Sequence, residues 1–192
     1  MSYRAAWIWF VGVATAVSFL TILTFLPDAT ESDSDRNAPL LVPMNLGLPV
    51  RLKIPVINVD AGIEYVGITS DGAMGVPKSP ESAGWFQFGP RPGETGSAVI
   101  DGHFGWRDNA PAVFDNLDSL RVGDRLYIED DTGATVTFIV RETRLYNPRE
   151  DAGSVFNSSD GKAHLNLITC EGVWDAVSES YSKRLVVFAD RE

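Results

Sequence analysis

Cys170 is the single cysteine of this 192-residue chain and its strongest candidate for a nucleophile. It closes the apolar run "HLNLITC" and is followed at once by Glu171 and a glycine. A lone cysteine cannot form an internal disulfide, so it acts as a small buried hydrophobe, an intermolecular link or a reactive thiol. A nucleophilic thiol needs a nearby base or cation that favours the thiolate. Composition alone favours the buried hydrophobe, whereas the predicted place at a strand end favours the reactive thiol.

Two histidines, His103 and His164, could supply the base. His164 shares a strand face with Cys170, but six residues at about 3.3 Å each separate them by roughly 20 Å. We therefore expect His164 to be a half-exposed residue at the entry of its strand. His103 ends the run "SAVIDGH" and could approach Cys170 if the two strands are neighbours; otherwise it is a loop histidine bonded to nearby backbone. With two distant histidines and no Cys-x-x-Cys pair, no metal site is predicted.

Arg184 opens the apolar run "RLVVFAD" and shares one strand face with Val186 and Phe188. A permanent cation at the start of an apolar strand is commonly paired with a surface acid, or it extends its charged end into water. It could instead stabilise an oxyanion. Lys183, on the opposite face, is the alternative cation.

The elements that must position these side chains are short strands joined by turns. Apolar alternation or β-branched runs bounded by turn residues predict strands, at residues 50–54, 62–68, 96–103, 125–130, 134–146, 164–170 and 184–190. Only residues 111–120 have the spacing of a helix, with a proline suited to its first turn. Because strands and helices do not alternate, we expect a mainly β fold, a single closed antiparallel β-barrel or sandwich with one or two short helices.

The N-terminal residues 1–26 predict a membrane anchor. Residues 5–26 carry no charge and would form a helix of roughly 33 Å, long enough to cross a bilayer. Arg4 before this run, with Asp28 and Glu31 after it, places the N-terminus in the cytoplasm and the remainder outside. A cleaved signal peptide is the alternative, but the run is long for one and lacks a good cleavage site.

Residues 27–49 are acidic and then rich in proline, as in a flexible tether, and residues 50–192 form the predicted folded domain. The chain has 16 basic and 26 acidic residues, and all but Arg4 lie after the predicted anchor. The exported part therefore carries 15 minus 26, or −11. This charge argues against a nucleic-acid partner. The acidic residues form no convincing calcium-ligand run, and no cofactor is predicted.

The order of these motifs resembles the sortases, membrane-anchored cysteine transpeptidases of mainly Gram-positive bacteria. The combination is "GH" after an apolar strand, then "LITC", then an arginine that opens the last strand. Further similar segments are "RLKIPVINVDAGIEYVG", "GAMGVPKSPESAGWFQFGPRPGETGSAVIDGH", "VFDNLDSLRVGDRLYIED" and "KRLVVFA", so the resemblance covers about residues 49–191. The run "GWFQFG-x-x-PGE-x-GSAVIDGHFG" is most like class F, with classes D and E as neighbours.

The resemblance implies that Cys170 is the nucleophile, His103 the catalytic histidine and Arg184 the catalytic arginine. Thr169 would shape the site beside the cysteine, and we expect Trp174 and Tyr181, in the loop that follows, to contact substrate or else to pack over the barrel mouth. Asn166 stands where the family usually has a threonine, so a changed fine shape of the substrate groove is expected.

The implied reaction cleaves an LPXTG-type sorting signal through a cysteine thioester and transfers the protein to an amine of a peptidoglycan precursor or of a pilin. The partners would be exported proteins that carry sorting signals, and the catalytic domain would be extracellular. One alternative is a thiol peptidase that only hydrolyses. Another is a non-catalytic anchored β-domain that binds wall polymer or a protein partner. The "SHGC"-like run of the L,D-transpeptidases is absent.

Overall fold

The computed structural model describes residues 46–192 except 108–109, 149 and 178–179. Within these residues no helix is long and apolar enough to cross a membrane. The predicted anchor, residues 1–26, and the predicted tether up to residue 45 lie outside the described residues.

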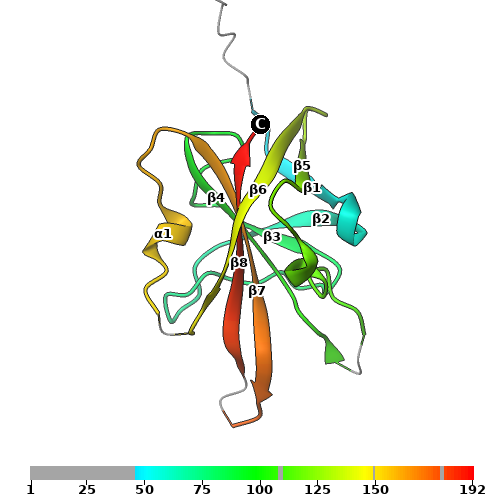
Figure 1. Ribbon diagram of the computed structural model, residues 1–192, viewed down its shortest axis with the longest axis vertical. Helices are drawn as coiled ribbons and strands as arrows, with labels where there is room; N and C mark the ends of the chain where they lie inside the picture. The colour runs from blue at the N-terminus through cyan, green and yellow to red at the C-terminus, as the bar shows by residue number, and fades with distance from the viewer. Residues whose placement is uncertain (1–45, 108–109, 149, 178–179) are drawn as a thin grey trace, which may run out of the picture. The chain divides into compact units, whose positions relative to one another are not determined.

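Eight strands form the folded domain (Figure 1). They are β1 (Pro49–Ile54), β2 (Val59–Val66), β3 (Ala83–Phe86), β4 (Gly96–Gly102), β5 (Arg125–Asp130), β6 (Thr135–Tyr146), β7 (Ala163–Asp175) and β8 (Ser180–Arg191). The short helices are η2 (Pro55–Ile57), η4 (Leu117–Ser119) and α1 (Gly153–Phe156). Alternation predicted seven of these strands and missed β3, whose sequence "AGWF" is too short to show a period.

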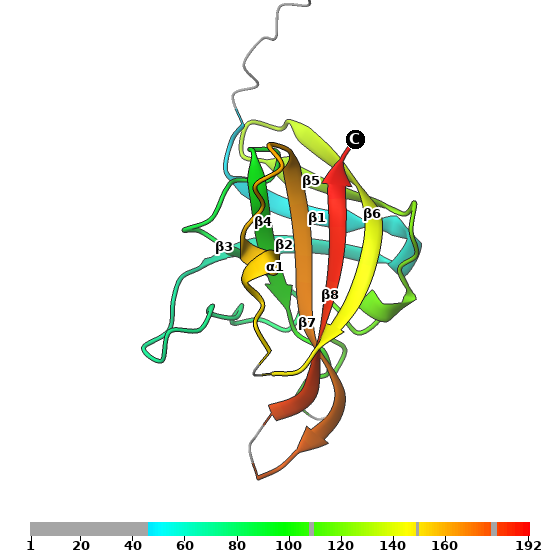
Figure 2. The ribbon, with the colours of Figure 1, turned by 60° about the vertical axis from the view of Figure 1, so that its left-hand side comes forward.

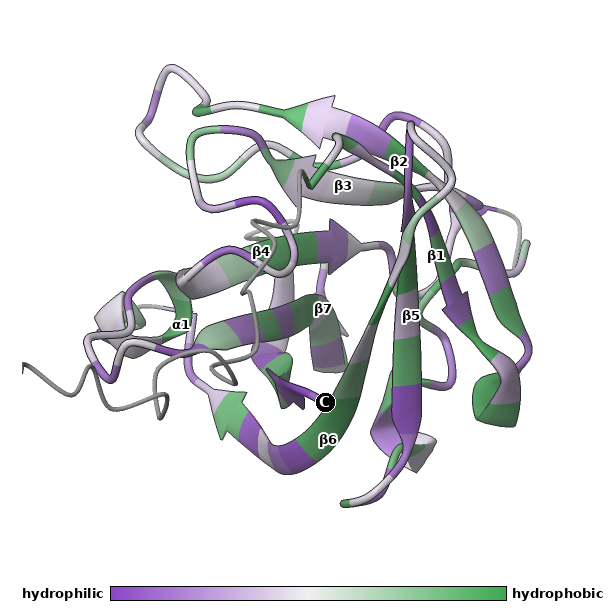
Figure 3. Ribbon diagram, turned by 90° about the horizontal axis from the view of Figure 1, so that it is seen from above, coloured by the Kyte–Doolittle hydropathy of each residue, from purple (hydrophilic) through white to green (hydrophobic). Residues whose placement is uncertain are grey.

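The strands close into one barrel in the order β1-β2-β3-β4-β7-β8-β6-β5. Figure 3 views this barrel from above. Two pairings, β2 with β3 and β4 with β7, are parallel. The predicted closed barrel is confirmed, but it is mixed, so the prediction of an antiparallel barrel was wrong at these two pairings. Alternation shows which residues face the core, but it contains no information on the direction of the neighbouring strand.

The barrel interior is filled by the side chains on the inward face of the strands, together with apolar side chains of the segment that contains η4. Its largest fully buried side chains are Leu52, Ile54, Ile100, Phe114, Leu117, Leu126, Ile128, Phe138, Val140, Leu165 and Leu167. A second, smaller cluster lies on the outer face of β7 and β8, where Val186 and Phe188 pack with Tyr146 and with Val155 of α1. Figure 2 shows α1 lying over this outer face, beside β4 and β7. Both faces of β7 are therefore buried in the barrel region, as expected for an interior strand.

The predicted helix at residues 111–120 was wrong, because only η4 is helical there and the rest forms turns. The carboxylate of Asp115 accepts hydrogen bonds from the backbone N–H groups of Gly105 (2.7 Å) and Ala112 (2.8 Å). An acidic side chain that binds backbone N–H groups in this way favours a turn over a helix. The apolar residues of the segment nevertheless face the core, with Phe114 and Leu117 fully buried.

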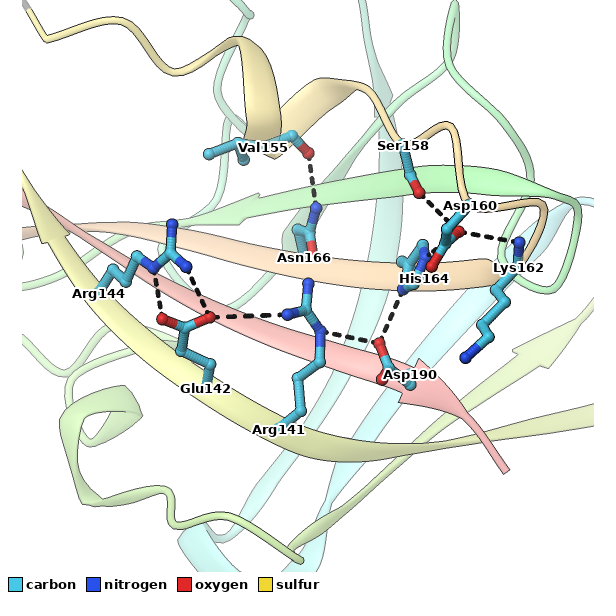
Figure 4. Close-up of polar contacts among 10 residues, drawn as sticks. All are labelled: Arg141, Glu142, Arg144, Val155, Ser158, Asp160, Lys162, His164, Asn166 and Asp190. Atoms are coloured by element: carbon cyan, nitrogen blue, oxygen red, sulfur yellow. Dashed lines mark hydrogen bonds and ion pairs between the residues drawn. The ribbon is translucent and has the colours of Figure 1, made fainter.

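His164 and Asn166 of β7 fasten the connection between β6 and β7, which carries α1 (Figure 4). The His164 ring lies 2.9 Å from Asp160 in this connection and 2.7 Å from Asp190 of β8. Asn166 donates its amide N–H to the carbonyl oxygen of Val155 at 2.6 Å. His164 is 6% exposed, so the prediction of a half-exposed histidine was wrong; burial follows from the two carboxylates that cover both ring nitrogens.

The charges around His164 continue outward across the sheet (Figure 4). Asp190 also pairs with Arg141 of β6 at 2.8 Å, and Arg141 lies 3.6 Å from Glu142. The hydrogen bond with His164 holds the pKa of Asp160 well below its usual range, with support from backbone N–H donation by Lys162. Among the described residues, no group of three or more His, Cys, Asp or Glu is placed to hold a metal ion.

Candidate active site

Cys170 lies within β7 at the point where this strand loses one of its two neighbours. The ladder between β4 and β7 ends at the pair Asp101–Ile168, while β7 and β8 stay paired beyond Cys170 as far as Asp175. The prediction that the strand ends at Cys170 was therefore wrong, because β7 and β8 continue as a hairpin that projects from the barrel (Figures 1 and 2). Cys170 is partly exposed on the outer face, so it is not fully buried as composition favoured.

Arg184 is the direct cross-strand neighbour of Cys170 in the antiparallel β7–β8 ladder. Such neighbours have Cβ atoms about 5 Å apart, which brings the guanidinium and the thiol to one place. The guanidinium donates to the carbonyl oxygens of Tyr181 (3.1 Å) and Lys183 (2.9 Å) and to the Ser180 hydroxyl (3.1 Å). These bonds fix the direction of the guanidinium and leave part of its fork of donors for a ligand.

Lys183, the alternative cation, lies on the other face of β8. It is paired with Glu171 across the ladder, and its ammonium group donates to the side-chain oxygen of Asn147. Neither of the two cavities that contain Cys170 has Lys183 in its lining. The structure therefore brings Arg184, and not Lys183, to the thiol.

His103 follows the last residue of β4, Gly102, and its position depends on close packing at that glycine. An added Cβ on Gly102 would overlap with the side chains of Phe114 and Val113. The carbonyl oxygen of Gly102 accepts a hydrogen bond from the Thr169 hydroxyl at 2.7 Å, which ties the end of β4 to β7. Thr169 is fully buried, so any contribution that it makes to substrate binding is indirect.

The ring of His103 is oriented by two contacts. Its Nε2 lies 2.8 Å from the carbonyl oxygen of Pro77, and its ring centroid lies 4.6 Å from that of Trp106. Because a carbonyl oxygen only accepts hydrogen bonds, Nε2 carries a hydrogen in this arrangement. The Nδ1 atom is then the nitrogen that is available to exchange a proton with a substrate.

Two cavities meet at these three side chains, and His103, Cys170 and Arg184 line both. The first, of about 440 Å³, lies between the hairpin and the segment after His103. We call it the hairpin cavity. The second, of about 380 Å³, lies over the outer faces of β4, β7 and β8 and under the connection that carries α1. We call it the α1 cavity. The three predicted residues thus lie together where one groove passes into the other.

Trp174 and Tyr181 face each other across the hairpin and line the hairpin cavity. Their ring centroids are 5.2 Å apart, and Tyr181 also packs edge to face against Phe104 at 5.4 Å. Trp174 is 51% exposed, which leaves a large apolar surface open to a ligand. The aromatic rings form one wall of the cavity. This position is compatible with both predicted roles, contact with substrate and packing over the barrel mouth.

Asp101 is a site residue that the sequence analysis missed. It lies in the α1 cavity, on the same outer face as Ile168 and Cys170. Burial raises the pKa of the Asp101 carboxyl to about 7, against the opposing effects of the Gly102 N–H and of Arg184. Burial also raises the pKa of the Cys170 thiol; the Arg184 charge lowers it and Asp101 raises it further. The sequence signal was an acid inside the otherwise apolar run "SAVIDG".

A mixed eight-stranded barrel brings Cys, His and Arg side chains to the junction of two grooves, an arrangement suited to acyl transfer through a thiol. The family model described as "Sortase domain" matches residues 52–192, so the chain belongs to the sortase family of cysteine transpeptidases.

Solved structures of sortases share this fold. Sortase C-1 from Actinomyces oris is 27% identical with a TM-score of 0.58, over 75% of this chain and 74% of that protein. Sortase A from Corynebacterium diphtheriae is 27% identical with a TM-score of 0.59, over 77% of this chain and 61% of that protein. The Clostridium perfringens sortase D5 transpeptidase is 24% identical with a TM-score of 0.57, over 75% of this chain and 78% of that protein. At this identity the similarity is evidence for the fold alone. No curated protein matches the chain.

Proposed function

We propose that this sortase cleaves an LPXTG-type sorting signal through a thioester on Cys170 and transfers the acyl group to an amine. The observation that supports the proposal is the meeting of a partly exposed thiol, a fixed guanidinium and an oriented imidazole between two cavities. One cavity can hold the peptide before the cleaved bond, and the other can hold the leaving group and later the acceptor.

In the first half-reaction the Cys170 thiolate attacks the carbonyl carbon between the threonine and glycine of the signal. The carbonyl oxygen becomes an oxyanion, which the free N–H groups of Arg184 stabilise. His103 donates the proton on Nδ1 to the leaving amine, and the C–N bond breaks to leave the thioester. In the second half-reaction His103 removes a proton from the incoming amine, which attacks the thioester and releases the Cys170 thiolate.

The acceptor and the cellular location are part of the same proposal. The acceptor is an amine of a peptidoglycan precursor or of a pilin, and the signal-bearing partners are exported proteins. The chain is anchored by residues 1–26, with the catalytic domain outside the cell, in agreement with the uncharged N-terminal run. The run before His103 supports class F, with D and E as alternatives, although the solved relatives named above are of classes A, C and D.

The test is acyl-adduct formation by the full chain in detergent micelles. With an LPXTG-type peptide, mass spectrometry should find the acyl group on Cys170, and the Cys170→Ala variant should gain none. An adduct that persists in Cys170→Ala would exclude the mechanism. Adding an amine should shift the product from the free acid to the amide; a product that stays hydrolysed would support the hydrolase alternative.

Arg184 and Lys183 give a matched pair of variants. We expect Arg184→Ala to lower kcat by about 100-fold or more, with an unchanged circular dichroism spectrum, because an oxyanion donor is lost. Lys183→Ala should keep nearly full turnover. Near-normal turnover in Arg184→Ala would contradict the role of the guanidinium.

A further inference from the structure

Asp101 is an acid in the floor of an otherwise largely apolar groove. The outer faces of β7 and β8 contribute Ile168 and Val186 to the floor of the α1 cavity, and α1 contributes Val155 and Phe156 to its wall. Glu150 also lines this cavity, but it is exposed and its carboxylate accepts hydrogen bonds from the backbone and side-chain nitrogens of Asn147. Asp101 differs from Glu150 in two respects that matter for binding: it is half-buried where Glu150 is exposed, and its oxygens have more open acceptor capacity.

The Asp101 carboxyl has few partners of its own. The backbone N–H of Gly102 donates to it, and the Arg184 charge attracts it from a distance. In the part of the chain that the structure describes, no side chain donates a hydrogen bond to it. A carboxylate has two oxygens that accept several hydrogen bonds, and leaving such acceptors unpaired in an apolar site is costly. A wholly apolar peptide in this groove would remove water from the Asp101 carboxylate without donating a hydrogen bond to replace it.

The register of the strands places Asp101 relative to the bond that is cleaved. Asp101 pairs with Ile168 in the parallel β4–β7 ladder, and Cys170 lies two residues further along β7. The Asp101 position is therefore about 6.6 Å from that of Cys170 along the strand and about 4.8 Å across it, or roughly 8 Å in all. We assign the α1 cavity to the part of the peptide before the cleaved bond. Because an extended peptide advances about 3.3 Å per residue, Asp101 then lies beside the second or third residue before that bond.

We infer that Asp101 is a specificity-determining residue, which selects sorting signals with a basic side chain at the second or third position before the cleaved bond. A lysine ammonium group or an arginine guanidinium would supply side-chain hydrogen bonds, which no described side chain donates to Asp101, and a second positive charge besides that of Arg184. The inference rests on the proposed function and narrows its substrate class. A basic residue at the second position is the variable residue of an LPXTG-type signal, whereas a basic residue at the third position would replace its proline.

The experiment measures kcat/KM for peptides that carry lysine, glutamine, methionine or glutamate at each of the two positions, at about pH 8 with the full chain in micelles. We expect the lysine peptide to be cleaved about tenfold more efficiently than the methionine peptide at one position, as a hydrogen bond to a charged group allows. In Asp101→Asn this ratio should fall to about one. The exposed surface acid variant Asp118→Asn should keep the wild-type ratio.

The pH profile of this ratio is an independent readout. The other charged or titratable groups that line this cavity are His103, Tyr146, Glu150, Cys170 and Arg184. Asp101→Asn keeps all of them, so the difference between the wild-type and Asp101→Asn pH profiles isolates the acid. Because the pKa of Asp101 is about 7, the lysine advantage should grow as the pH rises from about 6 to 8.

Two failures are distinguishable. If every peptide acylates Cys170 but lysine gives no advantage, or if the advantage persists in Asp101→Asn, the inference is overturned while the proposed function stands. If a thiol reagent labels Cys170 but no peptide acylates it, the proposed function fails and the inference with it.

Discussion

Replacing Thr169 by valine tests whether the hydrogen bond between β4 and β7 positions His103, the histidine that we propose to be catalytic. The substitution keeps the volume of a fully buried side chain but removes the hydroxyl that donates to the Gly102 carbonyl oxygen at 2.7 Å. Leaving a buried acceptor without this partner costs about 1–3 kcal/mol. For a domain of this size each kcal/mol lowers Tm by about 2–4 °C, so we expect a fall of roughly 2–12 °C.

The same substitution should lower activity, because Gly102 directly precedes His103. We expect kcat to fall more than KM changes, since the loss concerns proton transfer and not peptide binding. Thr169→Ser is the matched control: it loses the methyl group, at a cost of about 1 kcal/mol, but keeps the donor. The serine variant should therefore lose stability while keeping kcat.

The outcomes separate a structural role from a positioning role. Melting by circular dichroism and single-turnover acylation are measured on the same samples. A valine variant with reduced Tm and normal kcat would show that Thr169 supports only the fold. A valine variant with both values at the wild-type level would refute the reasoning, because it would mean that the hydrogen bond to Gly102 contributes nothing.

Two further predictions concern Asp101 and His164. Asp101→Asn should speed iodoacetamide alkylation of Cys170 by up to about 30-fold above about pH 8 and hardly below pH 6. The two strand positions lie roughly 8 Å apart, and at an effective dielectric constant of about 20 an ionised carboxylate at that distance opposes the thiolate by about 2 kcal/mol. A rate ratio that does not change with pH would contradict this coupling. His164→Ala should leave Asp160 without its ring partner and loosen the connection that covers the α1 cavity, so we expect a few-fold higher KM, nearly unchanged kcat and faster hydrogen exchange in residues 150–160, and unchanged exchange there would contradict the anchoring role.

Much of the barrel was predictable because its strands alternate. The segment 125–130 was predicted at the bounds of β5, and 134–146 differs from β6 by one residue. The errors have local causes. The helix at 111–120 gave way to turns because the Asp115 carboxylate binds backbone N–H groups, and β3 is too short to show a period. The parallel pairings were missed because the hydrogen bonds between strands join backbone groups. These groups are the same in every residue, so the side-chain pattern does not show whether a neighbouring strand runs parallel or antiparallel.

The candidate site was predictable in its residue types and less so in its arrangement. Separation along one strand excluded His164 as the partner of Cys170, and the structure shows that histidine bonded to two carboxylates instead. The sequence run "SAVIDG" contained Asp101, but nothing local showed that this acid would face a groove beside the thiol. That placement depends on β4 lying next to β7.

The sequence by itself determined the family, the closed β architecture and the three side chains that meet at the site, because these depend on residue types, motif order and short-range periodicity. Only the tertiary structure decided that Cys170 lies where β7 parts from β4, that Arg184 is its neighbour across the ladder, and that Asp101 lines a groove beside the thiol. The physical reason is that strand pairing and register join residues far apart in the chain, and the free energy of that pairing is shared by the whole barrel core.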